Sequence, residues 1–341
     1  METMIGLICL ILAANLHSGD AVDKLKLSSG HDIPVIGLGT FRLNQVEESI
    51  TNALEIGYRH IDTAFFYKNE AAIGAALKKW FQKGGKRDDI FITSKLPPHA
   101  NRADSVEKYL KKSLDDLDLE FVDMYLIHAP FGIKEGDNFS PAIGMNGSQI
   151  FEIADHVALW QKMEEQVTAG RAKSIGLSNF NQTQILNVYN NAKIKPSNLQ
   201  VESHAYFKQT ELREFCKKHS IVMTAYAPLG SPNTANELHK GTSKELPSLI
   251  GLPEIKEIAH KYNKTAAQVL LRHVVQAGIV AIPKSSNKDR QRENFDIFDF
   301  TLSEEDIEKI NKLEKGEKGR FFDFLGINKE LLKHPQYPIS S

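Results

Sequence analysis

Short apolar runs alternate with longer amphipathic segments along most of this chain. Eight of the runs are predicted as strands: residues 35–38, 58–61, 90–94, 122–127, 174–177, 198–201, 221–225 and 279–282. The segments between them repeat apolar residues at helical spacing and are predicted as helices: 46–55, 70–81, 104–117, 153–169, 182–190, 210–219, 252–262 and 266–275. Strands that alternate with helices pair in parallel through right-handed crossovers. Eight such units over about 250 residues predict an α/β fold, a (β/α)8 barrel of the TIM type.

The main alternative is an open doubly wound sheet, which usually carries a glycine-rich dinucleotide fingerprint after its first strand. Here the sequence at that point is Gly37-Leu38-Gly39-Thr40-Phe41-Arg42, which lacks the third glycine and does not lead directly into a helix. We therefore prefer the barrel, formed as a single domain by residues 22–341.

Several segments are expected to add to the regular barrel. Residues 24–27 and 33–37 predict an N-terminal β-hairpin around a polar turn. Insertions are predicted at residues 132–148 and 231–250. The tail, residues 315–341, carries aromatic residues and late prolines, and we expect it to form a C-terminal loop over the active site.

The first 21 residues differ in composition from the rest. Residues 4–16 are almost all apolar but too few to span a bilayer, and Gly19 and Ala21 supply small residues for a cut after Ala21. We expect residues 1–21 to be a cleaved signal peptide, although Glu2 and the lack of Lys or Arg are unusual for one. An uncleaved anchor and a disordered leader are the alternatives. The predicted location is therefore secreted, or cytoplasmic if the leader does not function.

Cysteine content is unusual for an exported protein, because removal of Cys9 with the leader would leave Cys216 alone and allow no intramolecular disulfide. N-glycosylation is permitted at four sequons: Asn138, Asn146, Asn181 and Asn263. The formal net charge of −1, without a basic block, argues against a nucleic-acid partner. No long exposed apolar face is evident, so we expect a monomer without stable membrane association after cleavage.

Ionisable residues stand where the predicted strands end, which is where barrels of this type place catalytic groups. Asp62, Lys95 and His128 end the second, third and fourth strands, and Tyr67 follows Asp62 on its loop. Each alone can be structural: a turn-forming Asp, a Tyr with its hydroxyl in water, a solvated Lys or a hydrogen-bonded His. Together, we expect buried Lys95 to lower the pKa of Tyr67 while Asp62 holds the lysine. His128 is expected to orient a substrate oxygen, so the set can protonate a carbonyl as hydride arrives at carbon.

Seven short motifs occur in the following order: Asp62-Thr63-Ala64-x-x-Tyr67-x-Asn69-Glu70, Thr93-Ser94-Lys95-Leu96, Ile127-His128-x-Pro130, Gly176-Leu177-Ser178-Asn179-Phe180, Gln200-Val201-Glu202, Ala225-Tyr226-x-Pro228-Leu229-Gly230-Ser231 and Ile282-Pro283-Lys284-Ser285. From about residue 24 to the C-terminus, the chain resembles the aldo-keto reductases, and aldose reductase in particular. The resemblance implies an NADP(H)-dependent carbonyl reductase without a Rossmann fold. It implies that Tyr67 is the general acid, tuned by Lys95 and Asp62, and that His128 orients the substrate.

The same resemblance implies a set of cofactor-binding residues. Ser178, Asn179 and Gln200 would bond the nicotinamide carboxamide. Tyr226 would stack on the nicotinamide ring, and Leu229 and Ser231 would lie along the pyrophosphate. The remaining implied contacts are Gly39 and Thr40 in the first loop and, at the adenosine end, Lys284, Ser285, Arg290, Glu293 and Asn294. The paired cations beside a serine suit a dianionic 2′-phosphate, so NADPH should be preferred to NADH, although a solvated charged face is the alternative.

The predicted substrate pocket departs from that of aldose reductase. Ala129 and Phe41 stand where aldose reductase has tryptophans, which predicts a wider or softer pocket, with Phe65 and Phe131 as further walls. Such a pocket suits a flat hydrophobic carbonyl. The loop pattern resembles the arthropod branch of the family, some of whose members reduce 3-dehydroecdysteroids, so a 3-ketosteroid is the expected class. Asn233 replaces an acidic cofactor clamp, which predicts faster cofactor release.

Other functions remain to be weighed. A cofactor-binding carrier or regulatory protein on the same scaffold is the second candidate, but such a protein has no need of all four catalytic residues. A sugar isomerase or aldolase is less favoured. The sequence has no metal-ligand cluster, and Asp62 beside Lys95 favours the charged lysine, which is unsuited to Schiff-base chemistry. We therefore expect no metal.

Overall fold

Eight parallel strands form a closed barrel. The computed structural model describes residues 23–145, 147–231, 240–242, 245–324 and 329–339. In order around the sheet the strands are β3 (Leu38–Gly39), β4 (His60–Asp62), β5 (Phe91–Leu96), β6 (Val122–Ile127), β9 (Ala172–Ser178), β10 (Asn198–Glu202), β11 (Val222–Tyr226) and β12 (Val280–Ile282). A parallel bridge between Ile36, just before β3, and Ala281 of β12 closes the sheet. The predicted (β/α)8 barrel is confirmed.

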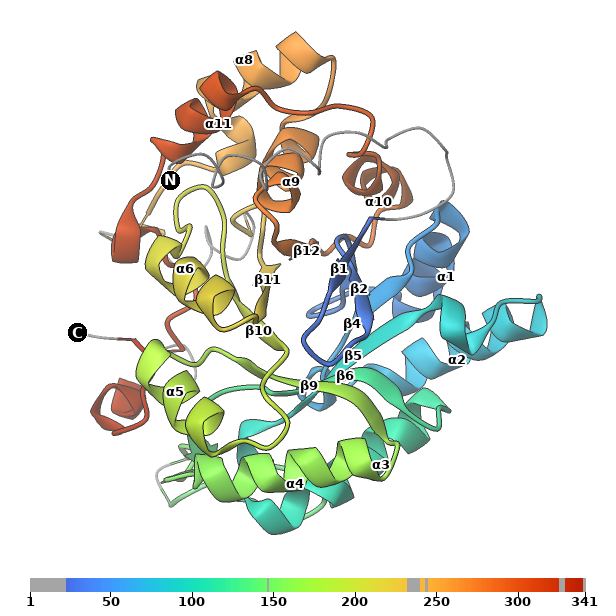
Figure 1. Ribbon diagram of the computed structural model, residues 1–341, viewed down its shortest axis with the longest axis vertical. Coiled ribbons are helices and arrows are strands. Elements are labelled where there is room, and N and C mark those ends of the chain that lie inside the picture. The colour runs from blue at the N-terminus through green and yellow to red at the C-terminus, as the bar shows by residue number, and fades with distance from the viewer. Residues whose placement is uncertain (1–22, 146, 232–239, 243–244, 325–328, 340–341) are drawn as a thin grey trace, which may run out of the picture.

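Helices surround the barrel (Figure 1). They are α1 (Val46–Ile56), α2 (Glu70–Gln82), α3 (Val106–Leu117), α4 (His156–Thr168), α5 (Gln182–Asn191), α6 (Thr210–Lys218), α8 (Pro253–Tyr262), α9 (Ala266–Gln276), α10 (Lys288–Phe295) and α11 (Glu304–Asn311). The first eight lie within three residues of the predicted bounds. Neither α10 nor α11 was predicted. In α10, almost no apolar residue marks a buried face. Its start depends on Asn287, whose side chain accepts a hydrogen bond from the Arg290 N–H (2.8 Å).

The amino-terminal end of the barrel is closed by the predicted hairpin. Its strands are β1 (Lys24–Lys26) and β2 (Asp32–Pro34), which pair antiparallel. Leu27 and Ile33 of this hairpin pack in one buried cluster with barrel residues that include Met124. Because this end is covered, the carboxyl ends of the strands are left to form a site.

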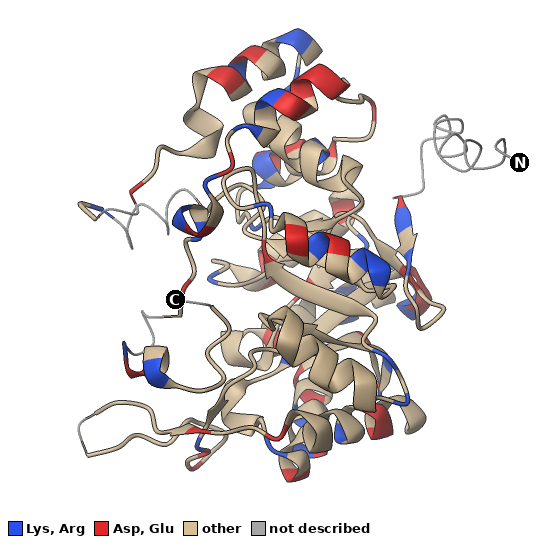
Figure 2. Cartoon of the chain, turned by 60° about the vertical axis from the view of Figure 1, so that its left-hand side comes forward, with Lys and Arg blue, Asp and Glu red and all other residues tan. Residues whose placement is uncertain are grey.

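The remaining connections contain one further hairpin. Strands β7 (Gly132–Ile133) and β8 (Phe151–Glu152) pair antiparallel within and just beyond the predicted insertion, whose polar composition did not indicate strands. The predicted leader, Asn146, Asn233 and half of the second insertion (232–239 and 243–244) lie outside the described residues. Of the helices that are described, none has the length and apolar character needed to cross a membrane. Acidic and basic residues are interspersed over the outer helices (Figure 2).

Candidate active site

The structure brings the four predicted catalytic residues together at the carboxyl ends of three adjacent strands. Asp62 ends β4, Lys95 lies near the end of β5, and His128 directly follows β6. Tyr67 ends a short 3₁₀ turn between β4 and α2. The Lys95 Nζ atom lies 2.6 Å from Asp62 Oδ1 and 3.4 Å from Tyr67 Oη. The rings of Tyr67 and His128 meet edge-on with centroids 5.6 Å apart.

Lys95 is completely buried, and all three of its ammonium protons have acceptors. Besides Asp62 and Tyr67, Nζ donates to the carbonyl of Thr63 at 2.8 Å. Burial lowers the pKa of Lys95, and the adjacent Asp62 carboxylate opposes that effect. The lysine is thereby held in one position, with its third proton directed at the tyrosine hydroxyl.

The predicted direction of the Tyr67 pKa shift is wrong. Burial of the hydroxyl, followed by the negative charge of Asp62, raises the pKa of Tyr67 well above its ordinary value. The physical reason is that the buried hydroxyl has lost the water that would stabilise its phenolate, and the nearby Asp62 carboxylate disfavours a second negative charge. Tyr67 is therefore protonated at neutral pH and available as a hydrogen-bond or proton donor.

His128 is neutral in this site. Burial, together with the nearby Lys95 charge, lowers the pKa of His128 well below its ordinary value. Its Nδ1 atom is buried without a hydrogen-bond partner in the described part of the chain. Its backbone carbonyl accepts a hydrogen bond from Asn179 Nδ2 at 2.8 Å. A neutral imidazole can donate a hydrogen bond to a substrate oxygen.

The residues implied for the nicotinamide end lie beside this group. Asn179 has a positive φ of 65°, and its side chain joins Ser178 Oγ (3.1 Å) and the Tyr226 hydroxyl (3.0 Å). Gln200 Nε2 donates to Asp62 Oδ2 at 2.6 Å. Sequence reasoning missed this link between Gln200 and the Asp62 carboxylate, because nothing in the local pattern pairs residues so far apart in the chain.

The residues implied for the phosphate end form a cationic cluster. Burial lowers the pKa of Lys284, and the positive charges of Arg290 and Arg42 lower it further. The three cations therefore lie near one another. Ser285 is buried and accepts from the Asn287 N–H (3.1 Å) at the start of α10. Arg42 was not predicted. Three cations beside a helix N-terminus provide a donor set that fits a phosphate dianion.

The other implied cofactor contacts occupy the same rim. Gly39 lies so close to β12 that a Cβ atom would come within 2.7 Å of the Ile282 carbonyl oxygen. Thr40 Oγ1 is buried and unpartnered within the described residues. Leu229 packs between two core clusters, and Ser231 has a φ of 42°. Within α10, Glu293 is exposed and Asn294 is buried.

Comparison with known proteins identifies the family. The sequence profile described as "Aldo/keto reductase family" matches residues 35–315. The chain belongs to this family. It is 41% identical over 328 residues to Aldo-keto reductase family 1 member A1 of Xenopus tropicalis, covering 94% of this chain and 98% of that protein. It is 40% identical over 325 residues to Prostaglandin F synthase 1 of Bos taurus, covering 93% and 97%.

A solved structure agrees with this assignment. The aldose reductase from Schistosoma japonicum superposes with a TM-score of 0.84 at 40% identity, covering 94% of this chain and 99% of that one.

Within the described residues of this aldo/keto reductase, no group of three or more His, Cys, Asp or Glu side chains is arranged to hold a metal ion.

The predicted pocket walls of this aldo/keto reductase occupy different environments. Phe41 is 42% exposed, and its ring lies 5.1 Å from that of Tyr67. Ala129 and Phe131 are buried in a cluster that includes Leu331 of the tail.

Phe65 and Phe66 point in different directions. The Phe65 ring packs on Tyr109 (5.0 Å), away from the catalytic group, whereas Phe66 is 39% exposed and meets His128 edge-on at 6.5 Å. The structure therefore brings Phe66, and not Phe65, to the predicted catalytic residue His128. Both residues belong to the same short turn, so no sequence pattern distinguishes them.

Proposed function

We propose that this aldo/keto reductase reduces an aldehyde or ketone to an alcohol at the expense of NADPH. The observation that carries the proposal is the fully buried Lys95, which is paired with Asp62 and directs a proton at Tyr67 beside the His128 ring. A protein that only binds cofactor has no use for this arrangement. Burying the Lys95–Asp62 pair costs free energy, because two charges must be removed from water.

The mechanism follows from the protonation states. Neutral His128 and protonated Tyr67 can both donate to a carbonyl oxygen placed between them, which orients and polarises the carbonyl. Bound NADPH supplies the hydride that reduces the carbonyl carbon. Tyr67 gives its proton to the oxygen as negative charge develops there. The phenolate that remains lies 3.4 Å from the Lys95 ammonium, which stabilises it and lowers the cost of the transfer.

The preference for NADPH is proposed from the phosphate end. Lys284, Arg290 and Arg42 concentrate positive charge near Ser285 and the start of α10. A dianionic 2′-phosphate can form charge-assisted hydrogen bonds there that a ribose hydroxyl cannot match. The nicotinamide carboxamide is assigned to Ser178, Asn179 and Gln200, with its ring on Tyr226.

The substrate is proposed to be a flat hydrophobic carbonyl such as a 3-ketosteroid, ecdysteroids included. Relatives are named for an aldose and for a prostaglandin, so family membership alone does not select the substrate. The small Ala129 after the catalytic histidine, with Phe41 and Phe66 exposed at the mouth, favours an apolar ring system over a sugar.

The test is NADPH oxidation, followed by absorbance, with purified protein lacking residues 1–21. A simple aromatic aldehyde, an aldose and a 3-ketosteroid are compared in parallel. Turnover of any one supports the reductase, and the steroid should have the lowest KM. Tight binding of NADPH without any turnover would favour the carrier, and failure to bind NADPH would overturn both functions.

We also propose that the chain is exported as a monomer after loss of residues 1–21. Asn138 and Asn263 are exposed and open to glycosylation. Asn181 is a poor acceptor, because its Oδ1 caps α5 (3.0 Å from the Gln184 nitrogen) and its Nδ2 contacts the Pro338 carbonyl. Recovery of the protein from the medium of expressing cells tests export, and its mass before and after glycosidase treatment tests glycosylation and the loss of residues 1–21. Its native mass in solution tests the monomer.

A further inference from the structure

We propose that Glu202 is a positioning residue that anchors the C-terminal segment 320–324 at a fixed place relative to Asp62. By fixing this segment, Glu202 determines which substrates fit. The inference rests on the proposed function for its kinetic test only. Glu202 is the last residue of β10, and its side chain has no exposure to solvent. A charged group in such a place needs compensation from several donors.

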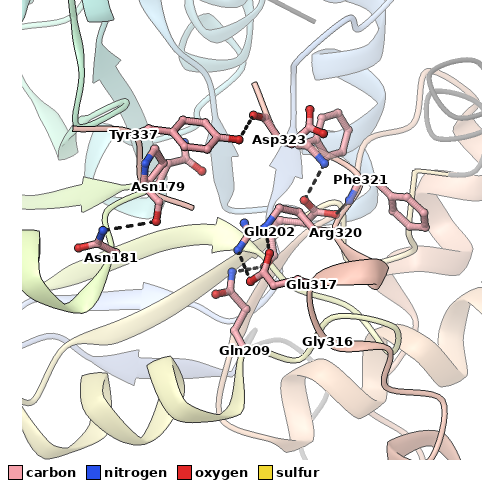
Figure 3. A network of polar contacts seen from close by, with 12 residues as sticks. Asn179, Asn181, Glu202, Gln209, Gly316, Glu317, Arg320, Phe321, Asp323 and Tyr337 are labelled. Atoms are coloured by element: carbon pink, nitrogen blue, oxygen red, sulfur yellow. Dashed lines mark hydrogen bonds and ion pairs between the residues drawn. The ribbon is translucent and has the colours of Figure 1, made fainter. Parts of the chain in front are cut away.

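The donors come from the tail. The Glu202 carboxylate accepts the backbone N–H groups of Phe321 (2.7 Å) and Phe322 (2.9 Å), one on each oxygen. It also lies 2.9 Å from Nε2 of the buried His204 (Figure 3 shows the surrounding polar network). A carboxylate that accepts two successive backbone N–H groups determines the path of that backbone, whatever side chains the segment carries.

The same strand carries the link to the catalytic group. Gln200 and Glu202 are two residues apart in β10, so their side chains lie on the same face of the sheet. Gln200 bonds Asp62, and Glu202 bonds the tail. In the register of the sheet, Glu202 pairs with Tyr226, the residue assigned to the nicotinamide ring. The tail is therefore positioned relative to the reacting centre by one short, rigid element.

The anchored segment packs aromatic rings against Tyr226 and Phe131. The Phe322 ring meets Tyr226 edge-on at 5.9 Å, and the Phe324 ring meets Phe131 at 5.6 Å. Arg320 precedes them, with its guanidinium 4.3 Å above the Phe207 ring and bonded to Glu317 (2.8 and 3.0 Å).

A second attachment lies further along the tail. The Tyr337 hydroxyl donates to the Asp323 carbonyl (2.8 Å), and the Gln336 side chain accepts from the Ala154 N–H (2.8 Å). Loss of the Glu202 anchor would therefore free the Phe322 end of the segment while the far end stays attached. Large apolar substrates that reach this wall would be affected, whereas a small aldehyde bound only at Tyr67 and His128 would not.

The kinetic test is Glu202→Gln, which keeps the volume but presents an amide NH₂ group to one of the two backbone donors. We expect the KM for a 3-ketosteroid to rise by about tenfold or more, while kcat/KM for a small aliphatic aldehyde changes by less than about twofold. The matched control is Glu305→Gln on α11, whose exposed side chain pairs with Lys309 (3.0 Å) and, within the described residues, has no bond to the segment 320–324. Equal changes for both substrates, or the same change in the control, would overturn the proposal.

Hydrogen exchange tests the anchor without any substitution. In the wild-type protein, we expect the Phe321 and Phe322 amides to be protected about as strongly as amides of the barrel strands. Fast exchange at both positions would overturn the proposal even if Glu202→Gln fails to fold. If the wild type reduces no carbonyl, the proposed function fails, and the exchange result alone still decides whether the anchor exists.

Discussion

Lys95 Nζ lies 2.6 Å from Asp62 Oδ1, and both side chains are almost entirely removed from water. The pair is completed by neighbours, since Asp62 Oδ2 accepts from Gln200 (2.6 Å) and Lys95 also donates to the Thr63 carbonyl. A buried pair of this kind is stable only while both members are present, because either charge alone would remain unpaired in a medium of low polarity.

Removal of one member should therefore cost more than removal of both. We expect Lys95→Met to lower the free energy of unfolding by about 3–5 kcal/mol, and Asp62→Asn by a comparable amount. The double variant should lose less than the sum of the two, because no unpaired charge remains. Urea denaturation of the three variants measures this coupling, and strictly additive losses would contradict it.

Tyr67→Phe isolates the proton donor. The substitution retains the ring contacts with Phe41 and His128 but removes the hydroxyl. We expect carbonyl reduction to fall by about 10²–10⁴-fold with NADPH affinity unchanged. Tyr109→Phe is the matched control, since the Tyr109 hydroxyl bonds Glu135 (2.8 Å) away from the site. Steady-state rates and NADPH titration distinguish the outcomes, and wild-type turnover by Tyr67→Phe would exclude it as the acid.

Glu70 makes stability depend on pH. Burial raises the pKa of Glu70 to about 7, although Ser94 and Ser113 donate to its carboxylate (2.5 and 2.9 Å). Between pH 4.5 and about 7, the folded state keeps a proton that the unfolded state has lost. This contribution therefore makes the protein less stable as pH rises, by about 1.4 kcal/mol per pH unit in that window.

Glu70→Gln should remove this dependence. We expect the variant to gain stability relative to wild type as pH rises from 5 to about 7, in proportion to the slope of about 1.4 kcal/mol per unit. The same substitution at Glu48, which is exposed on α1, serves as the control. Parallel stability curves for wild type and Glu70→Gln, measured by denaturation across this range, would show that the carboxyl is ionised throughout.

Lys284→Met tests the phosphate end of the cofactor site. Loss of one cation from the cluster with Arg290 and Arg42 should weaken NADPH binding by about tenfold or more, while NADH binding stays the same. Lys288→Met is the control, because that lysine is exposed and pairs with Glu55 (3.1 Å). Binding of both nucleotides is measured by fluorescence titration. An equal loss for NADH would mean that Lys284 does not contact the 2′-phosphate.

Much of the fold could be predicted from the chain itself. The strand–helix alternation predicted the barrel and eight of its helices, because apolar spacing is encoded within a few neighbouring residues. The same local reasoning missed α10, whose charged sequence has no apolar stripe. It also placed Asp62, Tyr67, Lys95 and His128 at one rim, because the parallel strands of a barrel all end on the same side.

Other properties were decided only by tertiary structure. The direction of the Tyr67 pKa shift depends on how deeply the hydroxyl is buried and on the negative charge of Asp62 beside it. The choice of Phe66 over Phe65 depends on the orientation of one short turn.

Long-range contacts are also decided only by the tertiary structure. Gln200 meets Asp62 across 138 residues of sequence, and Glu202 meets the tail across nearly as many. Desolvation and such contacts arise only when the closed barrel brings distant segments together. A local pattern therefore determines which residues reach the rim, and three-dimensional packing determines what each of them does there.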